Sequence, residues 1–237
     1  MKKELVKILQ SQGFGSRKEC TWMVKKSGVK INDKECRDPK ERFETEDLSF
    51  EVASQKWSYR EHLYLVMNKP AGYECSHTPD HHESVFSLLP VQFINRKIQV
   101  AGRLDVETEG LLLFSDNGNF IHHVTSPKKG IRKTYLAELK HPFSEEQKDK
   151  LVQGVELHQE FEKVRATEVE ATGDKEVRLT IDRGCYHQVR RMFGAVSNRV
   201  TGLTRERIGE LAVDDELKTG QWRYLEEADL QKLNWAD

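Results

Sequence analysis

Hydrophobic positions near the start of the chain recur at helical spacing and predict two short helices. The first pattern is formed by Leu5, Ile8 and Leu9. Gly13-Phe14-Gly15 interrupts it, and Ser16 and Glu19 then stand at the spacing of a capping box, in which each side chain bonds the backbone amide of the other. The second helix is expected to end at Gly28, and alternation over residues 29–34 predicts a strand that runs into a turn.

Apolar runs of strand length reappear further along the chain and predict a larger folded region. The expected strands cover residues 63–67, 111–114, 135–139 and 177–181. The expected helices cover residues 120–124 and 144–154. Strands and helices interleave without regular β-α-β units, which favours a mixed or antiparallel α+β fold over a doubly wound parallel sheet.

A weakly patterned, charged stretch separates the two regions. It covers residues 37–60, with one further strand expected around Phe50 and Val52. A chain of 237 residues is long enough for one good-sized core and a small satellite domain. The expected parts are a small N-terminal domain, a linker and a larger C-terminal domain, at residues 1–55, 56–61 and 62–237.

The formal net charge is only -1, but the charges are segregated along the chain. Residues 1–34 hold nine Lys or Arg and three acids, and a second basic cluster between residues 128 and 133 contains no acid. Basic surfaces of this kind attract polyanions, although solvated surface charge is the alternative interpretation. The residues that we expect to contact phosphates of such a partner are Arg17, Lys18, Lys25, Lys26, Lys128, Lys129, Arg132 and Lys133.

Several classes of protein are disfavoured. No stretch approaches the about 18 consecutive apolar residues that a membrane span needs. The four cysteines are far apart and form no C-x-x-C pair, so neither a zinc site nor a disulfide framework is indicated. His77, His81 and His82 have no spaced acidic partner that would make a metal site convincing, and the glycines at 13 and 15 lack the third glycine of a dinucleotide fingerprint. We expect a soluble cytoplasmic protein without a metal or a cofactor.

Candidate chemistry centres on Gly102-Arg103-Leu104-Asp105, which lies in a loop just before the predicted strand at 111–114. Gly110 permits close backbone approach nearby, and loops on rigid scaffolds often carry active sites. An aspartate in such a loop is more often a turn or capping residue. Spacing alone therefore leaves both interpretations open.

Motifs over nearly the whole chain resemble those of the RsuA-type ribosomal RNA pseudouridine synthases. The matching segments are Ser16-Arg17, Gly28 to Asn32, Met67 to Gly72, Gly102 to Asp105, Lys133 to Tyr135, Gly184 to Phe193 and Leu203 to Gly209. The resemblance implies an S4-like RNA-binding domain at the N-terminus, followed by a pseudouridine synthase catalytic domain.

The resemblance also implies roles for individual residues. Asp105 would be the essential carboxylate, paired with Arg190. Tyr135 would stack on the target base, and Leu203 would supply an apolar floor. Arg103 is the candidate for filling the gap that a flipped nucleotide leaves in the RNA. No cofactor is implied.

The resemblance implies that the substrate is a uridine in small-subunit (16S) ribosomal RNA, equivalent to position 516 of that RNA. We expect a monomer that acts on this RNA, free or in an assembly particle, without a membrane. Large-subunit (23S) RNA is the nearest alternative substrate. The sequence also leaves open a non-catalytic assembly factor, or a glycoside hydrolase that would need a second acid such as Glu107 or Glu109 near Asp105.

Overall fold

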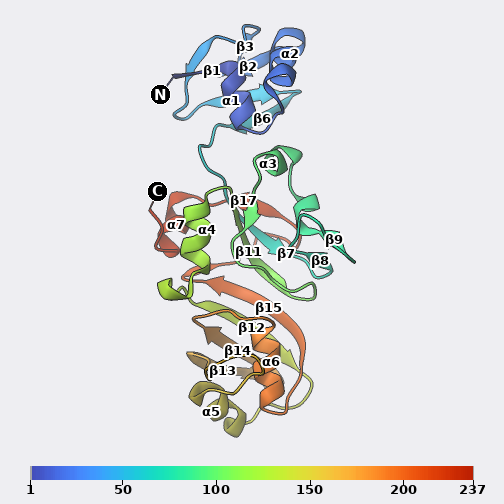
Figure 1. The fold of residues 1–237 in the computed structure, drawn as a ribbon, viewed down its shortest axis with the longest axis vertical. Coiled ribbons are helices and arrows are strands. Elements are labelled where there is room, and N and C mark those ends of the chain that lie inside the picture. The colour runs from blue at the N-terminus through green and yellow to red at the C-terminus, as the bar shows by residue number, and fades with distance from the viewer. Residues whose placement is uncertain (1, 237) are drawn as a thin grey trace. The chain divides into compact units, whose positions relative to one another are not determined.

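The computed structural model describes residues 2–236, which form two compact units. Unit 1 contains the chain up to Leu63 together with Leu89–Ile98, and unit 2 contains Tyr64–Leu88 and the chain from Gln99 onwards. None of the helices in the described part of the chain is both long and apolar enough to cross a bilayer. Each unit has its own core and is described separately (Figure 1).

Unit 1 contains three short helices and small sheets. Its helices are α1 (Leu5–Ser11), α2 (Arg17–Ser27) and α3 (Val91–Asn95). Its strands are β1 (Lys2–Glu4), β2 (Val29–Ile31), β3 (Lys34–Cys36), β4 (Arg42–Glu44), β5 (Ser49–Val52) and β6 (Gln55–Ser58). The order β3-β2-β5-β6 makes one sheet, and β1 pairs with β4. The predicted helices and the strands near residues 29 and 50 are confirmed.

Local chemistry fixes both ends of α2. The Ser16 hydroxyl accepts from the Glu19 amide at 3.4 Å, and the Glu19 carboxylate accepts from the Ser16 amide at 2.7 Å. The predicted capping box is therefore present. Gly28 ends the helix with a φ of 71°, a left-handed value that glycine adopts without a steric penalty. Cys20 and Val24 are buried, so α2 turns that side towards the core of unit 1.

The expected linker at 56–61 overlaps a strand. β6 pairs with β5 in the sheet of unit 1, and the Trp57 ring meets the Phe14 ring edge to face at 5.3 Å. Unit 1 consequently extends to Leu63, beyond the expected boundary at residue 55. The strand was missed because Gln55-Lys56-Trp57-Ser58 contains a single apolar residue, too few to show an alternating pattern.

Unit 2 is built on a large mixed sheet. Its strands are β7 (Tyr64–Lys69), β10 (Gln99–Val100), β11 (Glu109–Ser115), β12 (Lys133–Leu139), β13 (Glu168–Gly173), β14 (Glu176–Ile181), β15 (Val200–Ile208), β16 (Leu211–Ala212) and β17 (Trp222–Tyr224). The main path runs β13-β14-β12-β15-β11-β7-β17. Neighbours on it are antiparallel except β11 and β15, which are parallel over two residue pairs. The predicted α+β class with a mixed sheet is confirmed.

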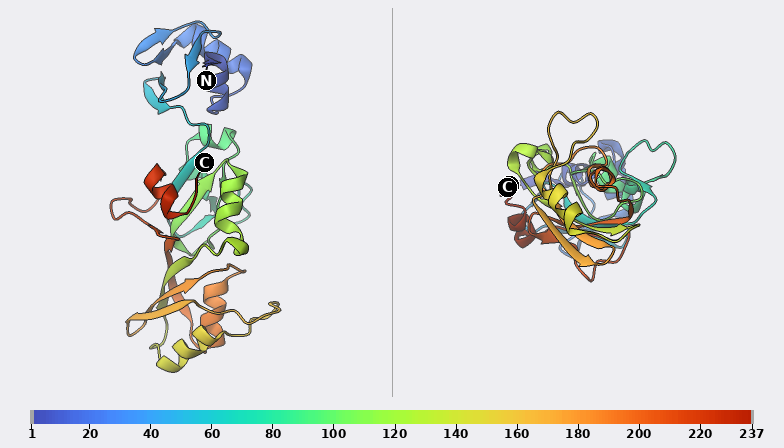
Figure 2. Two further views of the ribbon diagram at one scale, coloured as in Figure 1. Left: turned by 90° about the vertical axis from the view of Figure 1, so that its left-hand side faces the viewer. Right: turned by 90° about the horizontal axis from the view of Figure 1, so that it is seen from below.

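Helices cover successive parts of this sheet (Figures 1 and 2). They are α4 (Gly118–Thr125), α5 (Glu145–Gln153), α6 (Gln188–Ala195) and α7 (Glu227–Lys232), with 3-10 turns η1 (Val85–Leu88) and η2 (Pro127–Lys129). A short parallel pair, β8 (Tyr73–Glu74) and β9 (Glu83–Ser84), stands apart from the main sheet.

Two hydrophobic clusters form the core of unit 2. In one, Phe120 and Val124 of α4 pack with Leu111 and Leu113 of β11. In the other, α5 and α6 pack on β12 and β14. Leu112 and Phe114, on the opposite face of β11, are also fully buried, which explains the continuous apolar run that made this strand predictable from sequence.

Gly110 is required where β11 meets β15. Its φ is +97°, and a Cβ placed there would lie 2.4 Å from the Arg205 carbonyl oxygen. The two strands pair only at Glu109↔Thr204 and Gly110↔Arg205, so this close approach holds the two parts of the sheet together.

We predict that Gly110→Ala lowers the free energy of unfolding of unit 2 by about 3 kcal/mol or more, because the methyl group would meet backbone and the left-handed φ would be strained. Gly194→Ala is the matched control. Gly194 lies in α6 with open space around its Cα, so alanine there is expected to leave stability unchanged or raise it by about 0.5–1 kcal/mol. Denaturant unfolding of both variants tests this, and equal stability of the two would contradict it.

Candidate active site

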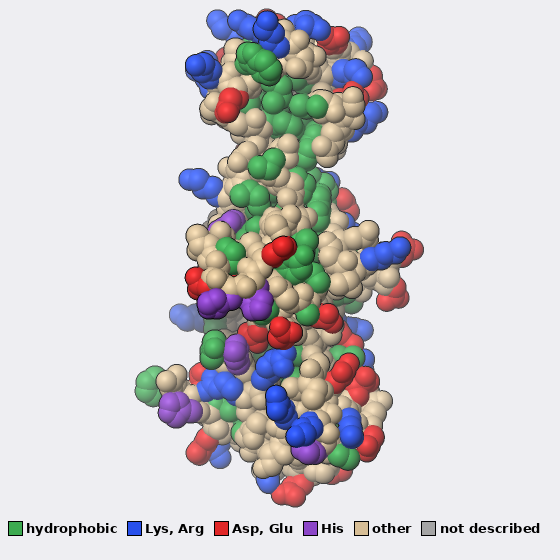
Figure 3. Space-filling view, turned by 90° about the vertical axis from the view of Figure 1, so that its right-hand side faces the viewer, with side chains coloured by type: hydrophobic (Ala, Val, Ile, Leu, Met, Phe, Trp, Pro, Cys, Tyr) green, Lys and Arg blue, Asp and Glu red, His purple; other side chains and the backbone are tan. Residues whose placement is uncertain are grey.

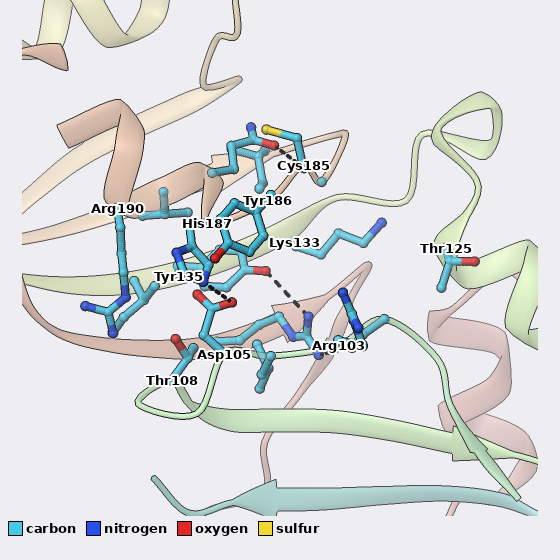
Figure 4. A pocket seen from close by; sticks show the side chains of 18 residues that line it. Arg103, Asp105, Thr108, Thr125, Lys133, Tyr135, Cys185, Tyr186, His187 and Arg190 are labelled. Atoms are coloured by element: carbon cyan, nitrogen blue, oxygen red, sulfur yellow. Dashed lines mark hydrogen bonds and ion pairs between the residues drawn. The ribbon is translucent and has the colours of Figure 1, made fainter. Parts of the chain in front are cut away.

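A cavity of about 360 Å³ opens in unit 2 beside the pairing of β11 and β15. The lining includes the loop from Gly102 to Asp105, β12, the turn into α6 with the first residues of that helix, and β15, together with single residues of other elements (Figure 4). Small-molecule sites in proteins begin at about 300 Å³, so the cavity is large enough for one nucleotide base and part of its sugar.

Asp105 and His187 face each other in this cavity. His187 Nε2 lies 3.4 Å from Asp105 Oδ1, and both side chains are partly exposed (Figure 4). His187 precedes the first turn of α6 in a left-handed conformation, with a φ of 47°. The Tyr186 ring stacks on the His187 ring at 3.8 Å, while Tyr186 itself is exposed. An aromatic pair thus stands beside the carboxylate at the mouth of the cavity.

A buried ammonium group holds the loop that carries Asp105. Lys69, at the end of β7, is completely buried, and its Nζ donates to the carbonyl oxygens of Pro70, Asp105, Val106 and Thr108 at 2.9, 3.3, 3.1 and 3.0 Å. Burial lowers the pKa of Lys69, and the carboxylates nearby oppose that shift. Because three of the four acceptors belong to the loop 105–108, this one side chain fixes its backbone.

Arg205 ties the other walls together. It is only 2% exposed, and its guanidinium donates to Leu111 O at 2.8 Å, to Gly102 O at 3.1 Å and to the Tyr135 hydroxyl at 3.5 Å. Its central carbon lies 6.0 Å from the centre of the Tyr135 ring, at the limit of a cation–π contact. One residue of β15 therefore positions β11, the Gly102 loop and the aromatic wall on β12.

Lys133 is buried in the cavity wall, which corrects its prediction as a surface contact to RNA. Its Nζ donates to Val124 O at 3.1 Å. Burial, and then the neighbouring charge of Arg205, lower the pKa of Lys133 to about 8. In the same predicted cluster, Arg132 pairs with Glu168 at 2.8 Å. Lysines 128 and 129, in η2, remain exposed.

The cavity is strongly cationic. Arg103, Lys133, Arg190 and Arg205 line it, and Asp105 is the acidic side chain among the lining residues that the structure describes. Neither Glu107 nor Glu109 belongs to the described lining, so the cavity does not present the pair of acids that a glycoside hydrolase uses. No three His, Cys, Asp or Glu side chains in that range come together as a metal site would require.

The structure brings the predicted site residues into one cavity but changes one contact. Asp105, Arg103, Tyr135, Arg190 and Leu203 all line it. The implied pairing of Arg190 with Asp105 is not made: Arg190 Nη2 donates to Glu107 O at 3.4 Å, and His187 takes the place beside the carboxylate. His187 and Arg190 stand three residues apart at the start of α6, so both face the Asp105 loop and reach different atoms of it.

Three residues of the site were missed as individuals by sequence reasoning. All three lie inside motifs that carry the family resemblance: Lys69 in Met67 to Gly72, His187 in Gly184 to Phe193, and Arg205 in Leu203 to Gly209. Their partners are far away in sequence or are backbone carbonyls, neither of which leaves a local signal.

Comparison with known proteins identifies the family of this chain. A family model described as RNA pseudouridylate synthase matches residues 63–195. Among curated relatives, the ribosomal small subunit pseudouridine synthase A of Yersinia pestis is 44% identical over 164 residues, which is 68% of each chain. The protein of that name from Vibrio cholerae is 37% identical over 223 residues, covering 92% of this chain and 94% of the relative.

Solved structures show the same likeness over both units. A crystal structure of a pseudouridylate synthase matches with a TM-score of 0.69 and 34% sequence identity. The match covers 97% of this chain and 99% of that chain.

We predict a pH dependence of stability that comes from Lys133. Because its folded pKa of about 8 is below the ordinary value of 10.5, the unfolded chain binds the proton more readily between these values. Burial of the charged Lys133 ammonium therefore destabilises the folded protein fully below pH 8. This destabilisation decreases as the pH rises to about 10. Wild type should gain on the order of 2–3 kcal/mol relative to Lys133→Met over this range.

Denaturant unfolding at pH 7, 8, 9 and 10 measures this difference. Lys140→Met, at an exposed position on the same unit, is the matched control for loss of one charge. Parallel stability curves for wild type and Lys133→Met would contradict the prediction.

Proposed function

Since this chain belongs to the RNA pseudouridylate synthase family and is a ribosomal RNA pseudouridine synthase, we propose that it isomerises a uridine in small-subunit (16S) RNA. We place the target at the uridine equivalent to position 516. The observation that carries the proposal is Asp105, held on a tethered loop in a cationic cavity of a chain similar to small-subunit synthases over 92% of its length.

The reaction sets three demands on the site. The bond from the sugar C1′ to the base N1 must break, the base must turn, and a new bond must form to C5, with the detached uracil retained throughout. A carboxylate can attack to form a covalent adduct or remove a sugar proton to give a glycal. We assign this role to Asp105. Tyr135 and Leu203 form an aromatic and apolar wall that can hold the uracil while it turns.

Fixed positive charge supports the carboxylate. Either route needs Asp105 ionised when the substrate arrives, and opposite charges favour that form. Arg205 and Lys133, both buried in the wall, supply this charge. Because their positions are fixed before substrate binds, no reorganisation is needed during the reaction.

The uridine must leave the RNA stack to reach this carboxylate. Flipping costs a few kcal/mol and is easiest in loops and strained helices. We assign Arg103, two residues before Asp105, to the gap that the base leaves, and we assign Arg190 to the RNA backbone at the cavity mouth.

Unit 1 is proposed to be an S4-like RNA-binding domain. The cations at positions 17, 18, 25 and 26 are exposed on α2, and none forms an ion pair with another described residue. Exposed Lys and Arg displace counterions from phosphates, which gives affinity without sequence preference. Lys128 and Lys129 of unit 2 are proposed as separate contacts to RNA phosphates. We further propose that the protein is a cytoplasmic monomer that acts on ribosomal RNA, free or in an assembly particle.

We predict that incubation of 16S and 23S RNA with wild-type protein gives one new pseudouridine, located in 16S RNA, and that Asp105→Asn gives none. The reason is that the amide cannot act as an anionic nucleophile or base. A pseudouridine map by chemical probing measures this. Asp149→Asn, an exposed aspartate on α5, is the matched control and should retain activity.

Each outcome points to a different function. A new pseudouridine in 23S RNA would move the substrate to the large subunit. Activity that survives in Asp105→Asn would remove the catalytic assignment. RNA binding by wild-type protein without any pseudouridine in either RNA would leave an assembly factor.

A further inference from the structure

An exposed tryptophan lies on the helix that carries the basic residues of unit 1. Trp22, in the middle of α2, is 62% exposed. The buried residues Cys20 and Val24 stand on the opposite side of the helix, so the indole turns away from the core. The other tryptophans, at 57, 222 and 235, each pack against another aromatic ring and are less exposed.

Three lysines surround this indole. Lys18 stands four residues before Trp22, and Lys25 and Lys26 stand three and four residues after it, spacings that place side chains on one face of a helix. All three are exposed. Arg17 stands five residues away and falls on a different side, so the face centred on Trp22 is narrower than the whole basic surface of α2. We call Lys18, Trp22, Lys25 and Lys26 the indole face.

The positive charge of the indole face is not neutralised within the protein. Four other lysines of unit 1, at positions 3, 7, 30 and 56, have acidic partners, as in Lys3–Glu61 at 3.0 Å and Lys30–Glu51 at 2.7 Å. No acid among residues 2–236 lies within ion-pair distance of the three lysines here. Glu19, the acid on α2, has its carboxylate bonded to the Ser16 amide in the capping box.

An aromatic ring among unpaired cations matches the chemistry of unpaired nucleic acid. Single-stranded RNA offers the π-face of each base for stacking and phosphates beside it for the lysines. A continuous duplex presents phosphates but no free base face. Figure 3 shows a group of Lys and Arg side chains at the upper edge of unit 1, with Asp and Glu side chains to either side of it. The positive charge around Trp22 favours a polyanion as the partner. A protein partner that only covered the indole would not need this charge.

We propose that Trp22 stacks on an unpaired base of the RNA substrate while Lys18, Lys25 and Lys26 contact the neighbouring phosphates. The inference rests on the proposed function, because it takes RNA as the partner of unit 1. It adds that unit 1 selects a loop or single strand, so the enzyme recognises an unpaired nucleotide at a second place besides the flipped uridine.

The test compares the binding of two RNA probes to the full chain. One probe is a short oligouridine, and the other is a blunt RNA duplex of similar charge. Trp22→Ala should weaken oligouridine binding about tenfold, the size of one lost stacking contact, and leave duplex binding unchanged. Trp22→Phe should retain most of the affinity. Val91→Ala, at a residue of unit 1 that is also 62% exposed but lies on α3, is the matched control and should bind both probes as wild type does.

Two further readouts separate stacking from charge. Oligouridine should quench tryptophan fluorescence in the wild type, and Trp22→Phe should remove that quenching while it still binds. Lys25→Gln should weaken both probes alike and reduce the salt dependence of binding. Unchanged oligouridine affinity in Trp22→Ala, or an equal loss for both probes, would overturn the proposal. Thermal unfolding checks that the variant is folded, which the exposure of Trp22 leads us to expect.

Failure here is distinguishable from failure of the proposed function. If Trp22→Ala binds like the wild type and the wild type still makes an Asp105-dependent pseudouridine, the stacking proposal alone is wrong. A pseudouridine map without product, from 16S RNA both free and in assembly particles, refutes the proposed function, whatever the oligouridine titration shows.

Discussion

The candidate active site depends on one buried guanidinium. Arg205 sits at the short parallel contact of β11 and β15, where the sheet is held by two residue pairs. Through Leu111 O and Gly102 O it fixes the strand and the loop on one side of the cavity, and through the Tyr135 hydroxyl it reaches the other side. A lysine at this position would keep the charge, but its donors would all start from one nitrogen, whereas the guanidinium of Arg205 uses three separate nitrogens to reach Leu111 O, Gly102 O and the Tyr135 hydroxyl.

Burying a charged group costs free energy because the group loses its hydration. Hydrogen bonds to backbone carbonyl oxygens offset this cost here. Lys69 and Lys133 follow the same rule as Arg205: each donates to main-chain carbonyls and none has a carboxylate within ion-pair distance among the described residues. An acid close enough to neutralise these cations would also compete with Asp105 and repel phosphate. Pairing with neutral carbonyls keeps the positive field directed into the cavity.

The features that could be predicted from the sequence are those whose signal lies within a short segment. The capping box at Ser16 and the buried run of β11 could be predicted because each signal lies within a few residues. Local patterns also favoured the α+β class, whereas the active-site residues came from family motifs. The contact between Asp105 and His187 could not be predicted, since it joins segments that only the folded sheet brings together. β15 was missed because Arg205 and its charged neighbours interrupt the apolar alternation, and its burial follows from tertiary partners.

The topology of unit 2 also governs when the enzyme can become active. β7 begins at Tyr64, yet its partner β17 ends at Tyr224, and the cavity needs β11 and β15, which are also distant in sequence. Closing such long loops makes folding slow, on the order of milliseconds to seconds for sheets rich in non-local contacts. During synthesis on the ribosome, a nascent chain that ends before β15 lacks one wall of the cavity. The cavity can therefore form only late, after β15 has been synthesised and has paired with β11, and activity is expected only from that point on.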